Sequence, residues 1–255
     1  MRAAAIMARI GNFIISLFAG VLILTMCAYG GYSLWDSYMI NQGAFLSQDL
    51  LKYKPASGDG EEASYSLEEL AAINPDTRGW LTVDQTHIDY PVVQGEDDMF
   101  YVNADVFKEF SLSGAIFLSC LNSPDFSDSY SLIYGHHMDN GGMFGDVLEF
   151  VNGDYFERHQ TGTLYLSDAT YSIRLFACME ADGYDHLIYN PGTDYDLSGL
   201  LDYLKTDSTQ YREIGVTAED KIIGMSTCVD AVTNGRVVLF GRLEERKAQE
   251  GGVEE

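Results

Sequence analysis

One cysteine of this chain stands where a nucleophile would be mounted. Cys228 follows Ser226 and Thr227 at the end of an apolar segment and precedes the turn-rich stretch 229–235. Such positions often carry chemistry, because a rigid scaffold holds them while solvent still reaches them. A free thiol has a pKa of about 8.5 and is only slightly ionised at neutral pH. A nucleophilic Cys228 therefore needs a nearby cation or base.

Two residues elsewhere in the chain could meet that need. His136 comes just after the apolar segment that ends at Tyr134, and an imidazole can give a proton to a leaving amine. Arg236 follows an Asn-Gly turn, so it lies close to Cys228 if the segments on either side of that turn pair as neighbouring strands. A guanidinium stays charged at neutral pH and can donate hydrogen bonds to a developing oxyanion.

The remaining cysteines and histidines favour structural roles. Cys27 falls within an apolar run and Cys178 within an apolar strand, where each is expected to act as a small buried residue. A disulfide between Cys120 and Cys178 stays open, because sequence alone does not fix the geometry. The histidines outside the reactive set are assigned to surface, loop or supporting positions: His87, His137, His159 and His186. A zinc site at His136 and His137 is the weaker interpretation, since no known ligand spacing is present, and we expect no metal or cofactor.

The charge of the chain excludes one class of partner. It has 255 residues with 39 acidic and 15 basic side chains, and every acid lies at or beyond Asp36. Arg2 and Arg9 precede that point, so the remainder is strongly acidic and repels phosphate backbones. We therefore expect no nucleic-acid partner. A hydrophobic content of 46% is enough for a folded core.

The N-terminal segment predicts a membrane anchor. Residues 10–35 carry no formal charge, and about 20 helical residues suffice to cross a bilayer. Arg2 and Arg9 place the N-terminus in the cytoplasm, with everything after Tyr32 outside. We expect a cytoplasmic tail over 1–9 and a transmembrane signal anchor over 10–32.

Two alternatives to an uncleaved anchor fit the sequence less well. A removable signal peptide usually has a shorter apolar region and a small-x-small cleavage site, neither of which is present here. A lipid-modified Cys27 would need a small residue before it, where this chain has Met26.

A linker and a short helix should connect the anchor to the main domain. Residues 33–65 include a polar, Gly-containing stretch that indicates a stalk or linker. Ser66 and Glu69 form a capping box that starts a helix ending near Asn74. This helix is expected to pack on the core through three apolar residues: Leu67, Leu70 and Ile73.

The body of the chain predicts a mainly β fold. Short segments rich in Val, Ile, Tyr and Phe alternate with Gly, Asn and Asp clusters, which favours a barrel or sandwich. Eight strands are expected: 80–83, 88–93, 115–118, 130–134, 163–166, 171–180, 221–225 and 236–243. Leucines at helical spacing over Leu197–Leu204 predict a helix between late strands. The catalytic domain should span 66–243, followed by a disordered tail over 244–255.

The motifs together resemble the sortase family, class B in particular. They are Ser226-Thr227-Cys228 followed by an Arg236 that opens the last strand, the stretch Ile133–Met138 with its Gly-His-His, and Gly79–Gln94. The resemblance covers about residues 66–243, with the motifs in family order. It implies an eight-stranded sortase-type barrel with a few peripheral helices.

The resemblance also implies a reaction. Cys228 would attack the Thr carbonyl of a sorting signal near the C-terminus of a secreted protein, and His136 would protonate the departing amine. Arg236 would stabilise the oxyanion, with Ser226 and Thr227 binding substrate. An amine of a cell-wall precursor or a pilin would then resolve the thioacyl enzyme. The alternatives are a hydrolytic cysteine peptidase and a non-catalytic, membrane-anchored binding domain.

Overall fold

The computed structural model describes residues 2–44, 48–55, 67–192, 194–229 and 233–246. The chain divides into two compact units, Met1–Gln42 and Gly43–Glu255.

The first unit is a single helix, α1 (Arg2–Ala44). Its stretch Arg9–Tyr38 is a candidate membrane span of 30 residues and contains an 18-residue window with a mean hydropathy of 2.2. At about 1.5 Å per residue, such a stretch exceeds the roughly 30 Å of a hydrocarbon core. Its apolar side chains are exposed, and Cys27, expected to be buried, is exposed with them. Residues 33–44, assigned from the sequence to the stalk, continue the same helix.

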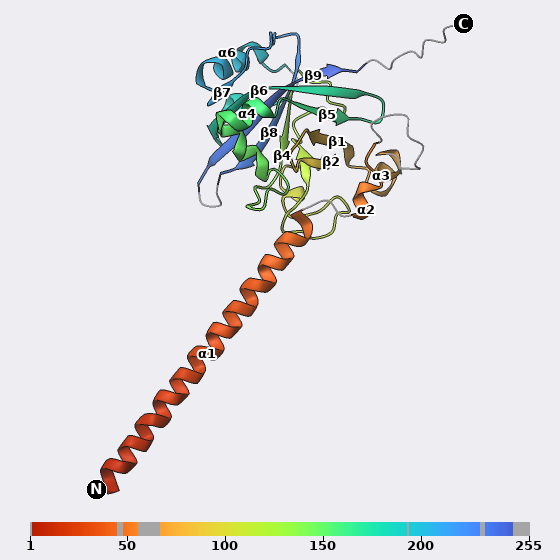
Figure 1. The fold of residues 1–255 in the computed structure, drawn as a ribbon. Coiled ribbons are helices and arrows are strands. Elements are labelled where there is room, and N and C mark those ends of the chain that lie inside the picture. The colour runs from red at the N-terminus through yellow and green to blue at the C-terminus, as the bar shows by residue number, and fades with distance from the viewer. Residues whose placement is uncertain (1, 45–47, 56–66, 193, 230–232, 247–255) are drawn as a thin grey trace. The chain divides into compact units, whose positions relative to one another are not determined.

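The second unit is built on a closed barrel of eight strands, as the sequence predicted (Figure 1). The ring runs β5-β1-β2-β3-β4-β8-β9-β6, and β6 pairs with β5 to close it. The strands are β1 (Thr77–Val83), β2 (Asp89–Val93), β3 (Ile116–Leu118), β4 (Tyr130–Tyr134), β5 (Thr161–Tyr165), β6 (Thr170–Asp182), β8 (Lys221–Cys228) and β9 (Gly235–Glu245). A ninth strand, β7 (Gln210–Tyr211), adds to β6 and was missed because two residues carry no periodicity.

Short helices surround the barrel. They are α2 (Gln48–Leu51), α3 (Leu67–Ile73), η1 (Phe100–Val102), η2 (Gly145–Val151), α4 (Gly153–Arg158), α5 (His186–Tyr189) and α6 (Leu197–Asp207). Figure 1 shows α2 and α3 beside β1 and β2, and α6 beside β6 and β7. The helices thus lie on the outside of the barrel wall.

Helix α6 confirms the leucine pattern read from the sequence. Asp196 caps it by accepting a hydrogen bond from the Gly199 amide at 3.1 Å. Leu197, Leu200 and Leu204 are buried in one apolar cluster with residues of the barrel wall. Each fully buried leucine contributes about 1.5–3 kcal/mol, so this face fixes the helix to the barrel.

Helix α3 corrects one expectation. Leu67 and Leu70 are buried as predicted, but Ile73 is 54% exposed. Asn74 is buried instead, because its amide donates to the Tyr101 hydroxyl at 2.9 Å and fastens the helix end. The capping residue Ser66 lies outside the described residues.

Both borders of the barrel domain differ from the expected limits. Within the expected linker, Tyr53 is buried against the barrel core and Lys54 pairs with Asp89 at 2.7 Å. At the other end, β9 runs on to Glu245, and the amide of Arg246 donates to the Thr170 carbonyl at 2.8 Å. The first residues of the expected tail are therefore part of the barrel, and 247–255 lie outside the described residues.

Candidate active site

The hairpin of β8 and β9 brings a thiol beside a guanidinium. Cys228 is the last residue of β8, and it lies directly opposite Arg236, the second residue of β9. Opposed residues of an antiparallel pair have Cβ atoms roughly 4.5–5.5 Å apart. The proximity expected from the Asn-Gly turn is therefore present.

His136 reaches the same end of the barrel through a different strand pair. Strands β4 and β8 run parallel, with Tyr134 opposite Ser226. His136 lies two residues beyond Tyr134, and Cys228 lies two residues beyond Ser226. The link continues beyond β4, because Gly135 donates its amide to the Ser226 carbonyl at 3.1 Å.

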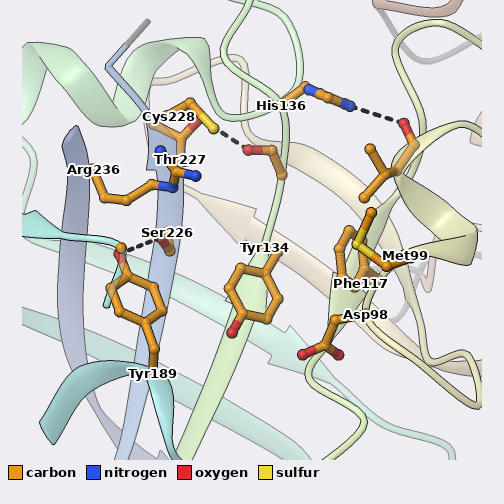
Figure 2. A pocket seen from close by; sticks show the side chains of 13 residues that line it. Asp98, Met99, Phe117, Tyr134, His136, Tyr189, Ser226, Thr227, Cys228 and Arg236 are labelled. Carbon is orange, nitrogen blue, oxygen red and sulfur yellow. Dashed lines mark hydrogen bonds between the residues drawn. The ribbon is translucent and has the colours of Figure 1, made fainter. Parts of the chain in front are cut away.

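A second bond ties the two segments together. The Thr227 hydroxyl donates to the Gly135 carbonyl at 2.9 Å, between the residue before Cys228 and the residue before His136 (Figure 2). The backbones that carry the thiol and the imidazole are therefore coupled on both sides of Gly135.

All five residues singled out from the sequence line one open cavity of about 490 Å³. They are Cys228, His136, Arg236, Ser226 and Thr227. Figure 2 shows Cys228 and His136 at one end of this cavity, with Arg236 beside Cys228. The other lining residues are Asp98, Met99, Val102, Phe117, Tyr134, Gly135, Gly183 and Tyr189.

The His136 ring is held in one orientation. Its Nε2 lies 2.8 Å from the Val102 carbonyl oxygen, in helix η1. A carbonyl only accepts hydrogen bonds, so Nε2 carries a hydrogen there and Nδ1 is left for proton exchange.

Arg236 keeps most of its donor capacity for a ligand. Its Nη1 donates to the carbonyl of Gly235 at 3.0 Å, and a second carbonyl, of Thr233, lies at 3.5 Å. Within the described residues no carboxylate forms an ion pair with it. The guanidinium is therefore a cation at the cavity wall that is not neutralised by a described acid.

Ser226 and Thr227 are buried, and their hydroxyls are engaged inside the protein. The Ser226 hydroxyl lies 3.0 Å from that of Tyr189, in helix α5. Burial raises the pKa of Tyr189 to about 12, so this wall of the cavity presents a neutral phenol. Sequence reasoning missed Tyr189, because the segment around it has neither periodicity nor a motif.

The far side of the cavity was also missed. Phe117 and Tyr134 form an apolar floor, and Asp98 and Met99 stand at its edge (Figure 2). The pKa of Tyr134 is raised by burial and then by the nearby Asp98 carboxylate. The groove therefore joins a cationic end to an end that holds one acid.

The other cysteines differ from Cys228. Cys178 is fully buried, and burial raises the pKa of its thiol to about 12. Burial and the Asp98 carboxylate also raise the pKa of Cys120. All four cysteines are free, so Cys120 and Cys178 do not form a disulfide.

One histidine corrects the expectation of surface or loop positions, whereas His87 is exposed in a turn as expected. His159 is buried, with its Nδ1 2.8 Å from the Tyr155 carbonyl and its ring stacked on that residue. His87 pairs through Nδ1 with Asp146 at 2.9 Å. Within the described part of the chain, no group of three potential metal ligands forms.

Comparison with known proteins identifies this arrangement. No family model matches the chain. A solved Streptococcus pyogenes class B sortase involved in pilus biogenesis is 41% identical, with a TM-score of 0.65, and the match covers 72% of this chain and all of that one. Sortase B of Listeria monocytogenes is 32% identical over 186 residues, which are 71% of this chain and 75% of the relative. The chain belongs to the class B sortases.

Other sortases extend the match. Sortase B of Staphylococcus aureus is 26% identical over 229 residues, covering 88% of this chain and 94% of the relative. Sortase B from the type II pilus of Streptococcus pneumoniae is 37% identical with a TM-score of 0.59, covering 69% and 96% of the two chains. The protein is accordingly a sortase-type cysteine transpeptidase with a class B barrel.

Proposed function

We propose that this sortase cleaves a C-terminal sorting signal after a threonine, with Cys228 as nucleophile. The thiolate sulfur forms a bond to the threonine carbonyl carbon, and Arg236 donates hydrogen bonds to the oxyanion that develops. The amide C–N bond then breaks, and His136 gives the leaving nitrogen, from Nδ1, the proton that it took from the Cys228 thiol when the thiolate formed. The product of this half-reaction is a thioacyl enzyme.

A second amine completes the transfer. It attacks the thioester carbonyl and loses a proton to His136, while Cys228 leaves as thiolate. Ser226 and Thr227 shape the groove that receives the acyl part. The amine belongs to a cell-wall precursor peptide or to a pilin, and the acyl donor is a secreted protein.

One observation carries this proposal. Cys228 and Arg236 face each other across two paired strands, and the parallel neighbour of one of these strands leads directly to His136 at the same cavity. Two segments distant in sequence, the β8–β9 hairpin and the segment after β4, thus converge on one open groove. A structural role for Cys228 would not require a guanidinium and an imidazole beside it.

The proposal extends to the acceptor, which we assign to pilus assembly. The solved structures from Streptococcus pyogenes and Streptococcus pneumoniae that match at 41% and 37% identity are both class B sortases of pilus systems. This likeness favours a pilin amine over a cell-wall peptide as the acceptor.

We further propose that the enzyme works outside the cell membrane. Arg2 and Arg9 precede the apolar stretch of α1, which supports a cytoplasmic tail over 1–9 and an anchor over 10–32. The catalytic barrel domain then faces secreted substrates on the outer side.

Trapping of the thioacyl enzyme tests the chemistry. Peptides of the Asn-Pro-x-Thr, Ser-Pro-x-Thr and Leu-Pro-x-Thr kinds are incubated with the protein, and adducts are read by intact mass spectrometry. We expect an adduct with the preferred peptide, and none for Cys228→Ala, while Cys120→Ala keeps it. An adduct that survives in Cys228→Ala would refute the assignment.

Product analysis separates transfer from hydrolysis. With an added lysine-containing peptide or an oligoglycine, we expect a ligated product that grows at the expense of the free acid. A free acid formed at the same rate with either amine would favour the hydrolytic peptidase.

A further inference from the structure

The segment that carries His136 is a closed loop rather than an extended connection. The amide of Phe144 donates to the His136 carbonyl at 3.0 Å, and His137 forms a bridge with Met143. The amide of Gly141 donates to the Met138 carbonyl at 2.9 Å. The loop is therefore closed by its own backbone contacts, so a contact that holds its far end also helps to fix the position of His136.

A buried tyrosine holds the base of this loop. The Tyr90 hydroxyl, from strand β2, accepts a hydrogen bond from the Met143 amide at 2.9 Å. Tyr90 is itself buried, so no water replaces this bond if it is lost. The contact joins the loop to a strand of the barrel that does not line the cavity.

An aspartate–histidine pair holds the loop a few residues further on. Asp146, at the start of η2, accepts from the His87 amide at 2.7 Å, and its same oxygen lies 2.9 Å from His87 Nδ1. Asp146 is buried, whereas His87 stands in the turn between β1 and β2. The bond crosses 59 positions of sequence and fixes the exit of the loop to that turn.

Gly141 shows how closely the loop fits this pair. Its φ of +82° lies in the left-handed region, which residues with a side chain rarely adopt. An added Cβ would stand 2.8 Å from Asp146 Oδ1 and 3.0 Å from His87 Nδ1. The tip of the loop therefore packs directly on the pair, with no room for a methyl group.

We propose that Tyr90 and the His87–Asp146 pair are positioning residues for His136. The Val102 carbonyl orients the ring from one side, and these two anchors hold the backbone loop from the other. Proton transfer is sensitive to such placement, because a donor displaced by about 1 Å loses much of its rate advantage. The inference rests on the proposed role of His136 as the proton donor.

The test uses two substrates that differ in their need for a proton. One is the preferred sorting peptide, with its scissile amide. The other is the same acyl sequence as a p-nitrophenyl ester, whose leaving group departs without protonation. For Tyr90→Phe and Gly141→Ala we expect kcat on the amide to fall about tenfold, with KM and the single-turnover rate of p-nitrophenolate release from the ester within about twofold of the parent.

Thr161→Val is the matched control. It removes one side-chain hydrogen bond, which the Thr161 hydroxyl at the start of β5 donates to Asp84, just after β1. We expect both substrates to react at the parental rate. Gly141→Ala serves as the second probe if Tyr90→Phe does not fold, because it leaves the buried hydroxyl in place.

Each outcome decides one question. Equal losses on amide and ester mean general disorder of the groove and overturn the inference. Unchanged amide turnover in both variants also overturns it, provided that His136→Ala loses amide activity. If His136→Ala keeps amide activity, the proposed function itself fails.

Discussion

Two cysteines on strands that flank β9 show how position along one strand decides chemistry. Cys178, on β6, lies opposite Leu239 in the middle of β9. Cys228, on β8, lies opposite Arg236 near the start of β9. The first is fully buried among apolar neighbours, whereas the second is half-exposed at the wall of an open cavity.

The contrast teaches that the barrel wall buries a thiol, whereas the open end of the barrel leaves a thiol accessible beside a guanidinium. In the wall, burial disfavours the thiolate and raises the pKa of Cys178 to about 12. At the open end, strand pairing places a guanidinium against the sulfur, and solvent reaches both. The same fold therefore keeps one thiol inert and presents the other to a substrate.

The largest expected effect is a difference in alkylation between these two thiols. At pH 8, a thiol with a pKa of about 12 has roughly a thousandfold less thiolate than one with a pKa of about 8.5. We expect iodoacetamide to modify Cys178 at least about a thousandfold more slowly in the native protein than after unfolding. Cys228 should react at least as fast as a model thiol, and peptide mass spectrometry resolves both sites.

The alkylation rate of Cys178 and its contribution to stability should both depend on pH. Because the pKa of folded Cys178 is raised, the buried thiol stabilises the native state fully below about pH 9 and loses that contribution as pH rises toward 12. Native Cys178 should gain reactivity about tenfold per pH unit in this window. Rapid labelling of Cys178 at pH 8, under conditions where the protein stays folded, would break the comparison.

Arg236→Ala should give the next largest effect. Loss of one oxyanion donor typically lowers kcat by about 10²–10³, and we expect that loss with the sorting peptide. Arg236→Lys should recover part of the activity, since it restores charge without the planar fork. Arg174→Ala is the control, because that arginine is half-exposed on β6 and pairs with Glu244. Steady-state kinetics that show a change in KM alone would assign Arg236 to binding.

The sequence predicted the barrel and the three converging residues for identifiable reasons. Turn residues between apolar segments located eight strands, and the Asn-Gly turn correctly placed Arg236 beside Cys228. Tyr189 and Val102 were not foreseen, because they reach the cavity from two short helices, α5 and η1, whose positions depend on long-range packing. Ile73 was misplaced because its helix ends there and a buried asparagine takes over the contact.

A substitution in the apolar cluster behind the barrel wall should affect stability and leave the reaction almost unchanged. Leu204, on α6, is fully buried in the cluster that joins this helix to the barrel. Removing its side chain leaves a cavity, so we expect Leu204→Ala to lower the free energy of unfolding by about 2–5 kcal/mol, as measured in urea. Its kcat should stay within about twofold of the parent at a temperature where both are folded.

Leu201→Ala is the matched control for this last substitution. Leu201 is only partly buried at the edge of the same cluster, so the same truncation should cost clearly less. Helix α6 does not contribute to the cavity lining among the described residues, so neither variant removes a group that a substrate touches. A loss of kcat in Leu204→Ala without a loss of folded protein would mean that the wall controls the open end, and that the two regions are not independent.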